Sequence, residues 1–413
     1  MQTGLADFIR NTPEGDAAEA VLRKCVHCGF CNATCPTYQL LGDELDGPRG
    51  RIYLMKQMFE GTVPAATVLP HLDRCLTCRN CETTCPSGVR YSELVDVGRA
   101  VAERRTQRPL AQRAARWVLR EGLSRPGIFG SALAIGRLVR PLLPASLAAK
   151  VAPERTAGAW PPVRHARRML VLAGCVQPAL MPDVNAAAAR VLDLVGISLV
   201  EAPRAGCCGA LRFHLNDQDG GRRDMRALID AWWPGIESGE IDAIVMTASG
   251  CGSTVREYGH LLADDPQYAE RAARVSAMTR DLSEILAAER VQIEGLFAAR
   301  PSAGKPLAYH PPCSLQHGQQ VRGLAENLLT AAGYALTPVT DSHLCCGSAG
   351  SYSLLQPQIA RTLRDSKLHA LQSGAAAGIA SANVGCIAHL QTGTATPVRH
   401  WIEWVDEAIS GTA

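Results

Sequence analysis

The sequence predicts an α+β multidomain protein, in which a helical N-terminal domain precedes two pseudo-repeated α/β domains. The chain has 413 residues, 47% of them hydrophobic, which is enough for two or three separate cores. Its sixteen cysteines fall into two families of eight, and each family repeats internally. A basic, proline-rich segment unlike either family lies between them.

The cysteine repeats define the expected domains. Cys25, Cys28, Cys31 and Cys35 recur 50 residues later as Cys75, Cys78, Cys81 and Cys85. Cys175, Cys207 and Cys208 recur 138 residues later as Cys313, Cys345 and Cys346, and Cys251 recurs 135 residues later as Cys386. We therefore expect a first domain over residues 1–122, a connector over 123–168, and two α/β repeats over 169–300 and 301–413.

Composition excludes several classes of protein. A formal net charge of +3 is too small for general nucleic-acid binding. No stretch of about 18 apolar residues predicts a membrane-spanning helix. The first residues lack the charged, apolar and small-residue pattern of a secretory signal. We therefore expect a cytoplasmic protein whose thiolates bind metal, with peripheral attachment to the inner face of the cytoplasmic membrane as a further option.

The first cysteine family carries a specific metal-binding pattern. Residues 25–36 read C-x2-C-x2-C-x3-C-P, and residues 75–86 repeat that spacing. Three closely spaced thiolates wrap a loop around one [4Fe–4S] cluster, whereas the fourth, followed by proline, reaches the other cluster. We assign cluster one to Cys25, Cys28, Cys31 and Cys85, and cluster two to Cys75, Cys78, Cys81 and Cys35. A pair of zinc sites is the alternative, although zinc sites seldom show this spacing twice.

Helical patterns surround these motifs. Residues 47–50 predict a turn and residues 51–59 a helix, because Ile52, Met55 and Phe59 recur on one face. Residues 93–108 predict another helix, and a further one follows Pro109. The first domain is therefore expected to be an α-helical ferredoxin domain with two [4Fe–4S] clusters. Arg49 and Arg51 are interpreted as helix-start and salt-bridge residues, with tuning of a cluster as the alternative.

The second family lies in two α/β repeats. In the first, strands at 169–173, 197–201 and 243–247 precede Cys175, the pair Cys207–Cys208, and Cys251. In the second, strands at 307–309, 334–337 and near Ile379 precede the equivalent cysteines. Cysteines just beyond strand ends lie where α/β sheets usually form sites. Each set of four could hold a further Fe–S cluster, a zinc ion or a redox-active disulfide. Four histidines near these loops are interpreted as hydrogen-bonded loop residues: His214, His310, His343 and His389.

The connector contains eight lysines and arginines and one acidic residue, Glu154. We expect one short amphipathic helix at residues 132–140, ended by Pro141. The segment is either a solvated linker or a docking surface for anionic lipid or a partner, since basic residues beside apolar ones suit both.

These motifs together resemble the glycolate oxidase iron–sulfur subunit family. The resemblance extends over almost the whole chain and includes residues 25–31, 39–51, 71–85 and 231–234. Two Cys-Cys-Gly repeats are also shared with subunits of anaerobic glycerol-3-phosphate dehydrogenase, lactate-utilisation complexes and heterodisulfide reductase. Far fewer protein families carry both the ferredoxin motif and the two Cys-Cys-Gly repeats than carry the ferredoxin motif alone.

The resemblance implies an electron-transfer subunit of an oxidoreductase. Partner subunits would carry FAD and oxidise glycolate to glyoxylate, and this chain would pass the electrons to a quinone or membrane acceptor. We assign no catalytic residue to this chain. The alternatives are the equivalent subunit of a lactate or glycerol-3-phosphate dehydrogenase, or a thiol–disulfide reductase similar to heterodisulfide reductase.

One departure from that last family affects its chemistry. Each repeat there ends in C-x2-C, whereas here Ala248 and Asn383 replace the first of the two cysteines. Four thiolates per repeat remain instead of five, which counts against disulfide cleavage.

Overall fold

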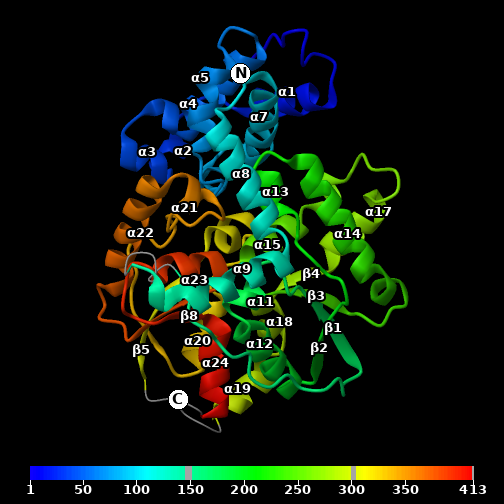
Figure 1. The fold of residues 1–413 in the computed structure, drawn as a ribbon, viewed down its shortest axis with the longest axis vertical. Helices are drawn as coiled ribbons and strands as arrows, with labels where there is room; N and C mark the ends of the chain where they lie inside the picture. The colour runs from blue at the N-terminus through cyan, green and yellow to red at the C-terminus, as the bar shows by residue number, and fades with distance from the viewer. Residues whose placement is uncertain (145–150, 299–303, 412–413) are drawn as a thin grey trace. The chain divides into compact units, whose positions relative to one another are not determined.

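The structure, a computed structural model, describes residues 1–144, 151–298 and 304–411 (Figure 1). The chain divides into two compact units. One contains Met1–Trp117 and His343–Lys367, and the other contains Val118–Ser342 and Leu368–Ala413. A short segment of the second repeat therefore belongs to the same compact unit as the ferredoxin-type motifs.

The first unit is helical. Its helices are α1 (Pro13–Lys24), α2 (Phe30–Ala33), α3 (Pro36–Leu41), the 3-10 helix η1 (Glu44–Asp46), α4 (Pro48–Phe59), α5 (Ala65–Asp73), α6 (Asn80–Thr84), α7 (Tyr91–Arg105) and α21 (Tyr352–Leu355). Helices α8 (Leu110–Leu123) and α22 (Pro357–Gln372) begin in this unit and end in the other. Helix α4 starts at Pro48, earlier than the sequence predicted, because proline suits the first turn of a helix.

The core of this unit places the cysteine motifs. Apolar side chains of α1, α4, α5 and α7 form one cluster that also contains Cys25, Cys75 and Cys81. Helix α7 approaches α4 closely at Gly98, where a Cβ atom would lie 2.4 Å from Sδ of Met55. Burying such apolar side chains contributes about 1.5–3 kcal/mol each. The cysteine loops are therefore attached to a packed scaffold.

Two hydrogen bonds attach residues 343–367 to the helical core. The amide of Asn80 donates to the carbonyl of His343 at 3.2 Å. The Tyr352 hydroxyl donates to the carbonyl of Arg74 at 3.0 Å. Asn80 and Arg74 each adjoin a cysteine of the ferredoxin-type motifs, so this segment, which carries Cys345 and Cys346, packs close to the second of those motifs.

The second unit contains two parallel four-stranded sheets with equivalent strand orders. The first, ordered β2-β1-β3-β4, is built from β1 (Arg167–Val171), β2 (Ile197–Glu201), β3 (Ala243–Met246) and β4 (Thr279–Asp281). The second, ordered β6-β5-β7-β8, is built from β5 (Pro306–His310), β6 (Ala335–Leu336), β7 (Gly378–Ser381) and β8 (Val398–His400). The predicted pseudo-repeat is therefore confirmed. The sequence analysis missed β4 and β8, which are three residues long and lie at sheet edges.

Further helices precede, connect and follow these strands. They are α9 (Pro126–Val139), the 3-10 helix η2 (Arg140–Leu142), α11 (Gln177–Leu180), α12 (Asp183–Leu194), α13 (Ala210–His214), α14 (Gln218–Glu237), α15 (Ser249–Val255), α16 (Tyr258–Leu261), α17 (Ala269–Met278), α18 (Leu282–Ala288), α19 (Arg290–Ala298), the π-helical turn η3 (Ser314–Gly318), α20 (Leu324–Ala331), α23 (Val384–Gln391) and α24 (Trp401–Ser410). Parallel strands need such crossovers, because a tight turn cannot return the chain in the same direction. Within the described ranges, no helix combines the length with the hydropathy that a membrane crossing requires.

The two sheets of this unit are joined by buried polar contacts. The N–H of Ser249 donates to the carbonyl of Ala382 at 3.1 Å, and Nε2 of His400 bonds the carbonyl of Thr247 at 2.8 Å. Because that carbonyl only accepts, the imidazole of His400 carries its proton on Nε2. Burial lowers the pKa of His400 to about 4, so it stays neutral at physiological pH.

The connector helix is longer than the sequence predicted. Helix α9 begins at Pro126, where residue 132 had been expected, and a 3-10 turn follows it. Proline at its first position explains the earlier start. Residues 145–150 of the connector lie outside the described residues.

Candidate metal centres

The first unit contains two cavities that are each lined by four predicted cluster ligands. One is lined by Cys25, Cys28, Cys31 and Cys85. The other is lined by Cys35, Cys75, Cys78 and Cys81. Cys81 also borders the first cavity, so the two are adjacent. The fourth cysteine of each motif thus lines the cavity of the other motif, and the assignment of these cysteines to two clusters stays a prediction.

Each cysteine loop bends through two left-handed residues. His27 and Gly29 have φ angles of 59° and 87°, and the equivalent Thr77 and Arg79 have 52° and 61°. Alternation of right- and left-handed residues turns successive backbone N–H groups towards one point, as in many phosphate and Fe–S sites. The N–H of Thr77 lies 3.4 Å from Sγ of Cys75. The loop backbone is therefore suited to an anionic group.

The two motifs meet at equivalent residues. The Thr84 hydroxyl donates to the Thr34 hydroxyl at 3.2 Å, and these threonines are 50 residues apart like the cysteines that follow them. The amide of Asn80 donates to the carbonyl of Thr34 at 3.0 Å. These contacts explain how Cys35 and Cys85 each reach the opposite cavity.

Electrostatics of the buried thiols favour a cationic centre. Burial, together with Cys25 and its neighbours, raises the pKa of Cys31 to about 11. Burial, together with Cys78 and Cys75, raises the pKa of Cys81 well above its ordinary value. Neighbouring thiolates repel each other in a poorly solvated site, and a bound metal removes that cost. The donor set therefore fits an iron–sulfur cluster, which binds cysteine as thiolate.

The first Cys-Cys-Gly repeat gathers four thiols at one end of its sheet. Cys175 follows β1, the pair Cys207–Cys208 follows β2, and Cys251 lies in α15 after β3. The strand order reverses between β1 and β3, which is where α/β sheets open a crevice. The thiols form a hydrogen-bonded chain from Cys175 through Cys207 and Cys208 to Cys251.

Within this chain, Cys207 carries the negative charge most readily. Hydrogen bonds from Cys175 and Cys208 hold its pKa well below the ordinary value, and the backbone N–H of Gly209 and the guanidinium of Arg212 add to the effect. The pKa values of Cys175 and Cys208 are raised, because each donates to Cys207 and both are buried. The site thus has one stabilised thiolate and three further sulfur ligands within reach.

Glycine after each cysteine pair is required by the backbone. Gly209 has a φ of 82°, and a Cβ atom there would lie 2.5 Å from the carbonyl oxygen of Gly221. Gly347 has a φ of 86°, and its Cβ atom would lie 2.6 Å from the carbonyl oxygen of Ala360. Any other residue would meet both conformational strain and a backbone clash.

The cysteines of the second repeat are divided between the two units. Cys313 and Cys386 belong to the second unit, at the start of η3 and in α23, whereas Cys345 and Cys346 belong to the first. Whether these four bind one metal stays a prediction. The loop position expected for the four histidines is wrong for three of them, because His310 ends strand β5 and His214 and His389 lie in helices α13 and α23. His310 is buried and hydrogen bonded, with Nδ1 2.9 Å from the Ser381 hydroxyl.

Asn383, which stands where a related family has cysteine, has a structural role. Its amide donates to Sγ of Cys386 at 3.4 Å, and its carbonyl oxygen accepts from the N–H of Gly250 at 3.2 Å. Asn383 therefore joins the Cys386 turn to the turn that carries Cys251, and it occupies the place of a fifth thiolate.

Two buried residues beside Cys75, Tyr91 and Arg99, were not singled out from the sequence. The Tyr91 hydroxyl lies 3.7 Å from Sγ of Cys75, and Arg99 donates to the Cys75 carbonyl at 2.8 Å. Burial raises the pKa of Cys75, but Arg51 and Arg99 outweigh it and lower the net value. Arg51 had been considered a salt-bridge residue first, and it does pair with Asp46 at 3.5 Å. Its position in the GPRGR segment was the available signal.

Known protein families match both cysteine-containing regions of the chain. The 4Fe-4S dicluster domain matches residues 21–89, and the cysteine-rich domain matches residues 169–256 and 307–391. The glycolate oxidase iron-sulfur subunit of Escherichia coli is 52% identical over 99% of both chains. The probable glycolate oxidase iron-sulfur subunit of Bacillus subtilis is 30% identical over 91% of this chain and 89% of that protein.

The chain belongs to the glycolate oxidase iron–sulfur subunit family. Lactate utilization protein A of Bacillus licheniformis is more distant, at 26% identity over 52% of this chain and 87% of that protein. Family membership, the matched domains and the cysteine-lined cavities agree that this is an iron–sulfur protein of an oxidoreductase system.

The crossover of Cys35 and Cys85 can be tested by cluster loss. We expect Cys85→Ser to remove the same cluster as Cys28→Ser, although Cys85 lies in the other motif, because both line the first cavity. By the same reasoning, Cys35→Ser should match Cys78→Ser. Electron paramagnetic resonance of the reduced proteins, with iron analysis, compares the four spectra. Pairing of Cys85→Ser with Cys78→Ser would contradict the crossover.

Proposed function

We propose that this chain is the electron-transfer subunit of a glycolate oxidase complex. It would take electrons from FAD on partner subunits that oxidise glycolate to glyoxylate, and pass them towards a quinone. The observation that carries the proposal is the pair of adjacent cysteine-lined cavities in a chain related end to end to glycolate oxidase iron–sulfur subunits. Each cavity would hold one [4Fe–4S] cluster.

The proposed relay divides one two-electron oxidation into two one-electron transfers. Flavin accepts a hydride equivalent, whereas each [4Fe–4S] cluster exchanges one electron at a time. The protein holds the two cluster sites next to each other through the shared wall at Cys81, which gives electrons a short route between them. The helical core keeps both loops in place.

The relay is tested in the purified complex with its flavoprotein partner. Cys28→Ser and Cys78→Ser should each reduce glycolate-driven quinone reduction to the rate of the partner without this chain, because each removes one relay centre. Bleaching of the flavin by glycolate should continue and serves as the internal control. Normal quinone reduction in either variant would exclude the relay.

A lactate-oxidising complex is the second candidate, and the similarity to lactate utilization protein A supports it over half of the chain. Substrate choice would belong to the flavin subunit, so the same experiment distinguishes the two by which hydroxy acid bleaches the flavin. A thiol–disulfide reductase is less consistent with the residues, because Asn383 occupies the place of a fifth cysteine in its repeat.

We also propose that Cys175, Cys207, Cys208 and Cys251 hold a further iron–sulfur cluster. These four thiols lie at one end of the sheet, and hydrogen bonds join them in the order Cys175, Cys207, Cys208 and Cys251. Cysteine thiolates are the usual ligands of Fe–S clusters, and a zinc ion is the alternative.

Metal analysis distinguishes the alternatives for this repeat. We expect the protein to contain more than the about eight irons of two [4Fe–4S] clusters, and Cys207→Ser to lose the excess together with acid-labile sulfide. Loss of zinc instead would identify a structural zinc site. If neither metal changed, a dithiol–disulfide role would replace the cluster.

We propose a cytoplasmic location with peripheral attachment to anionic membrane. Helix α9 and the turn after it expose Ile135, Leu138 and Leu142, which are 62%, 80% and 85% exposed. Arg137 and Arg140 lie among these apolar side chains. A surface of apolar and basic side chains binds the boundary of anionic lipid bilayers.

Vesicle co-sedimentation of the full chain tests this attachment. Leu138→Asp should weaken binding to phosphatidylserine-containing vesicles, with little binding to phosphatidylcholine vesicles in either protein. Val291→Asp, at a position 83% exposed on α19, is the matched control and should bind as the unchanged chain does. Equal binding of all three proteins to anionic vesicles would contradict the proposed surface.

A further inference from the structure

Two buried arginines lie beside the cysteines of the second cavity. Arg51 on α4 is 1% exposed and Arg99 on α7 is 6% exposed. Both approach the loop that begins at Cys75, from different helices. Full burial of an arginine is uncommon, because removing its charge from water is costly unless it is well hydrogen bonded.

Every nitrogen of the Arg51 guanidinium has a partner. Nη1 lies 4.0 Å from Sγ of Cys35, the ligand that crosses into this cavity. Nη2 donates to the Thr37 hydroxyl at 3.1 Å, and Nε donates to the His71 carbonyl at 2.7 Å. The Thr37 hydroxyl in turn lies 3.3 Å from Sγ of Cys35. The charge is therefore held against a cluster ligand in a fixed geometry.

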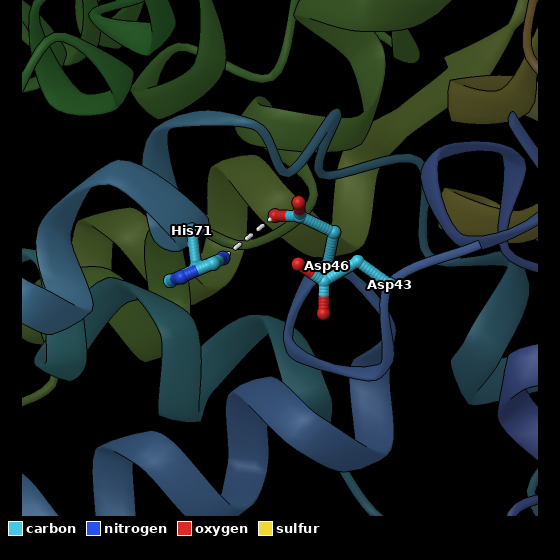
Figure 2. Close-up of side chains that lie close together, drawn as sticks. All are labelled: Asp43, Asp46 and His71. Carbon is cyan, nitrogen blue, oxygen red and sulfur yellow. Dashed lines mark hydrogen bonds and ion pairs between the residues drawn. The ribbon is translucent and has the colours of Figure 1, made fainter. Parts of the chain in front are cut away.

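The nearest carboxylate, that of Asp46, is shared with other side chains and is therefore not available to Arg51 only. Asp46 is 1% exposed and receives His71 Nδ1 at 2.9 Å, Arg74 Nη1 at 2.8 Å and Arg51 Nη2 at 3.5 Å. Figure 2 shows the His71 contact and the neighbouring Asp43. Asp46, Asp43 and His71 are close enough to bind a cation, but two guanidinium groups already occupy Asp46. The group is better explained as an ion-pair network that holds Arg51 in place.

Arg99 brings a second charge, and its hydrogen-bond acceptors in the described part of the chain are uncharged oxygens. Nη2 donates to the carbonyls of Leu72 and Cys75 at 2.9 and 2.8 Å, and Nη1 donates to the Thr77 hydroxyl at 2.8 Å. These oxygens accept from both terminal nitrogens but leave the charge in place. Its field acts on the Cys75 loop from the side of α7.

The first cavity has a different electrostatic setting. Arg49 borders it, but its side chain is 35% exposed and pairs with Glu44 at 2.6 Å. Solvent screens the charge of Arg49, and the ion pair with Glu44 offsets that charge further. The two cavities therefore have similar sulfur ligands and different charge surroundings.

We propose that Arg51 and Arg99 raise the reduction potential of cluster two above that of cluster one, so that cluster two is reduced first. This proposal depends on the assignment of both cavities to [4Fe–4S] clusters. Reduction adds one electron, and therefore one negative charge, to a buried site. A fixed positive charge nearby stabilises the reduced form more in a poorly solvated interior than it would in water. Arg51 and Arg99 act on cluster two through the electric field of their positive charges.

A redox titration of the full chain, followed by electron paramagnetic resonance, tests the order of reduction. Arg51→Met should lower the potential of cluster two so that its oxidised-to-reduced ratio at a fixed potential rises at least tenfold, which is about 59 mV for one electron. Arg51→Lys keeps the charge and should retain most of the wild-type value. Arg49→Met is the matched control, with a smaller shift confined to cluster one. Chains that also carry Cys28→Ser or Cys78→Ser assign each signal to its cluster.

The outcomes separate this proposal from the proposed function. Unchanged potentials in an Arg51→Met protein with full iron content would overturn it, as would equal shifts of both clusters. If Arg51→Met loses iron, Arg99→Gln carries the same expectation, and an unchanged potential there would overturn it. Because the titration uses no glycolate and no partner, a selective shift would stand even if glycolate-driven electron transfer were absent.

Discussion

Mutual repulsion between buried thiolates is the constraint on which the rest of this structure depends. Each cavity of the first unit brings four cysteines together, one of them from the other motif. Such a group is stable in its charged form only with a compensating cation, which is why burial and neighbouring sulfurs raise the pKa values of Cys31 and Cys81. The left-handed residues in each loop, the threonine contact between the motifs and the apolar core all serve to hold that arrangement.

The sequence predicted the parts of the fold that follow from short-range spacing. Strand β2 at Ile197–Glu201 matches its predicted bounds, and β1, β3 and β5 lie within one or two residues of theirs. These segments have strong apolar patterns. The short strands β4 and β8 were missed, because three residues at a sheet edge carry too weak a pattern for a propensity argument.

Contacts between residues far apart in the sequence could not be predicted from motif spacing or apolar patterns. Spacing predicts which cysteines share a cluster, since the fourth cysteine of such a motif ligates the other cluster. It could not indicate that Arg51 and Arg99 lie beside the loop that begins at Cys75. Arg51 reaches the His71 carbonyl from α4, and Arg99 reaches the Cys75 carbonyl from α7, so both contacts join segments that are far apart in the sequence. Nor did the 138-residue repeat predict that His343–Lys367 packs with the helical unit, through bonds between Asn80 and His343 and between Tyr352 and Arg74.

The two kinds of repeat have therefore diverged in different ways. In the ferredoxin-type motifs the sulfur spacing is unchanged, and the difference lies in the charge around them: a solvent-screened Arg49 on one side and buried Arg51 and Arg99 on the other. In the Cys-Cys-Gly repeats the glycine geometry is kept at Gly209 and Gly347, whereas the surroundings of the cysteines differ. Unequal reduction potentials give an electron a preferred position on one of two neighbouring clusters, whereas equal potentials give none. Keeping the ligands and changing the field around them achieves that inequality without changing the chemistry of the sites.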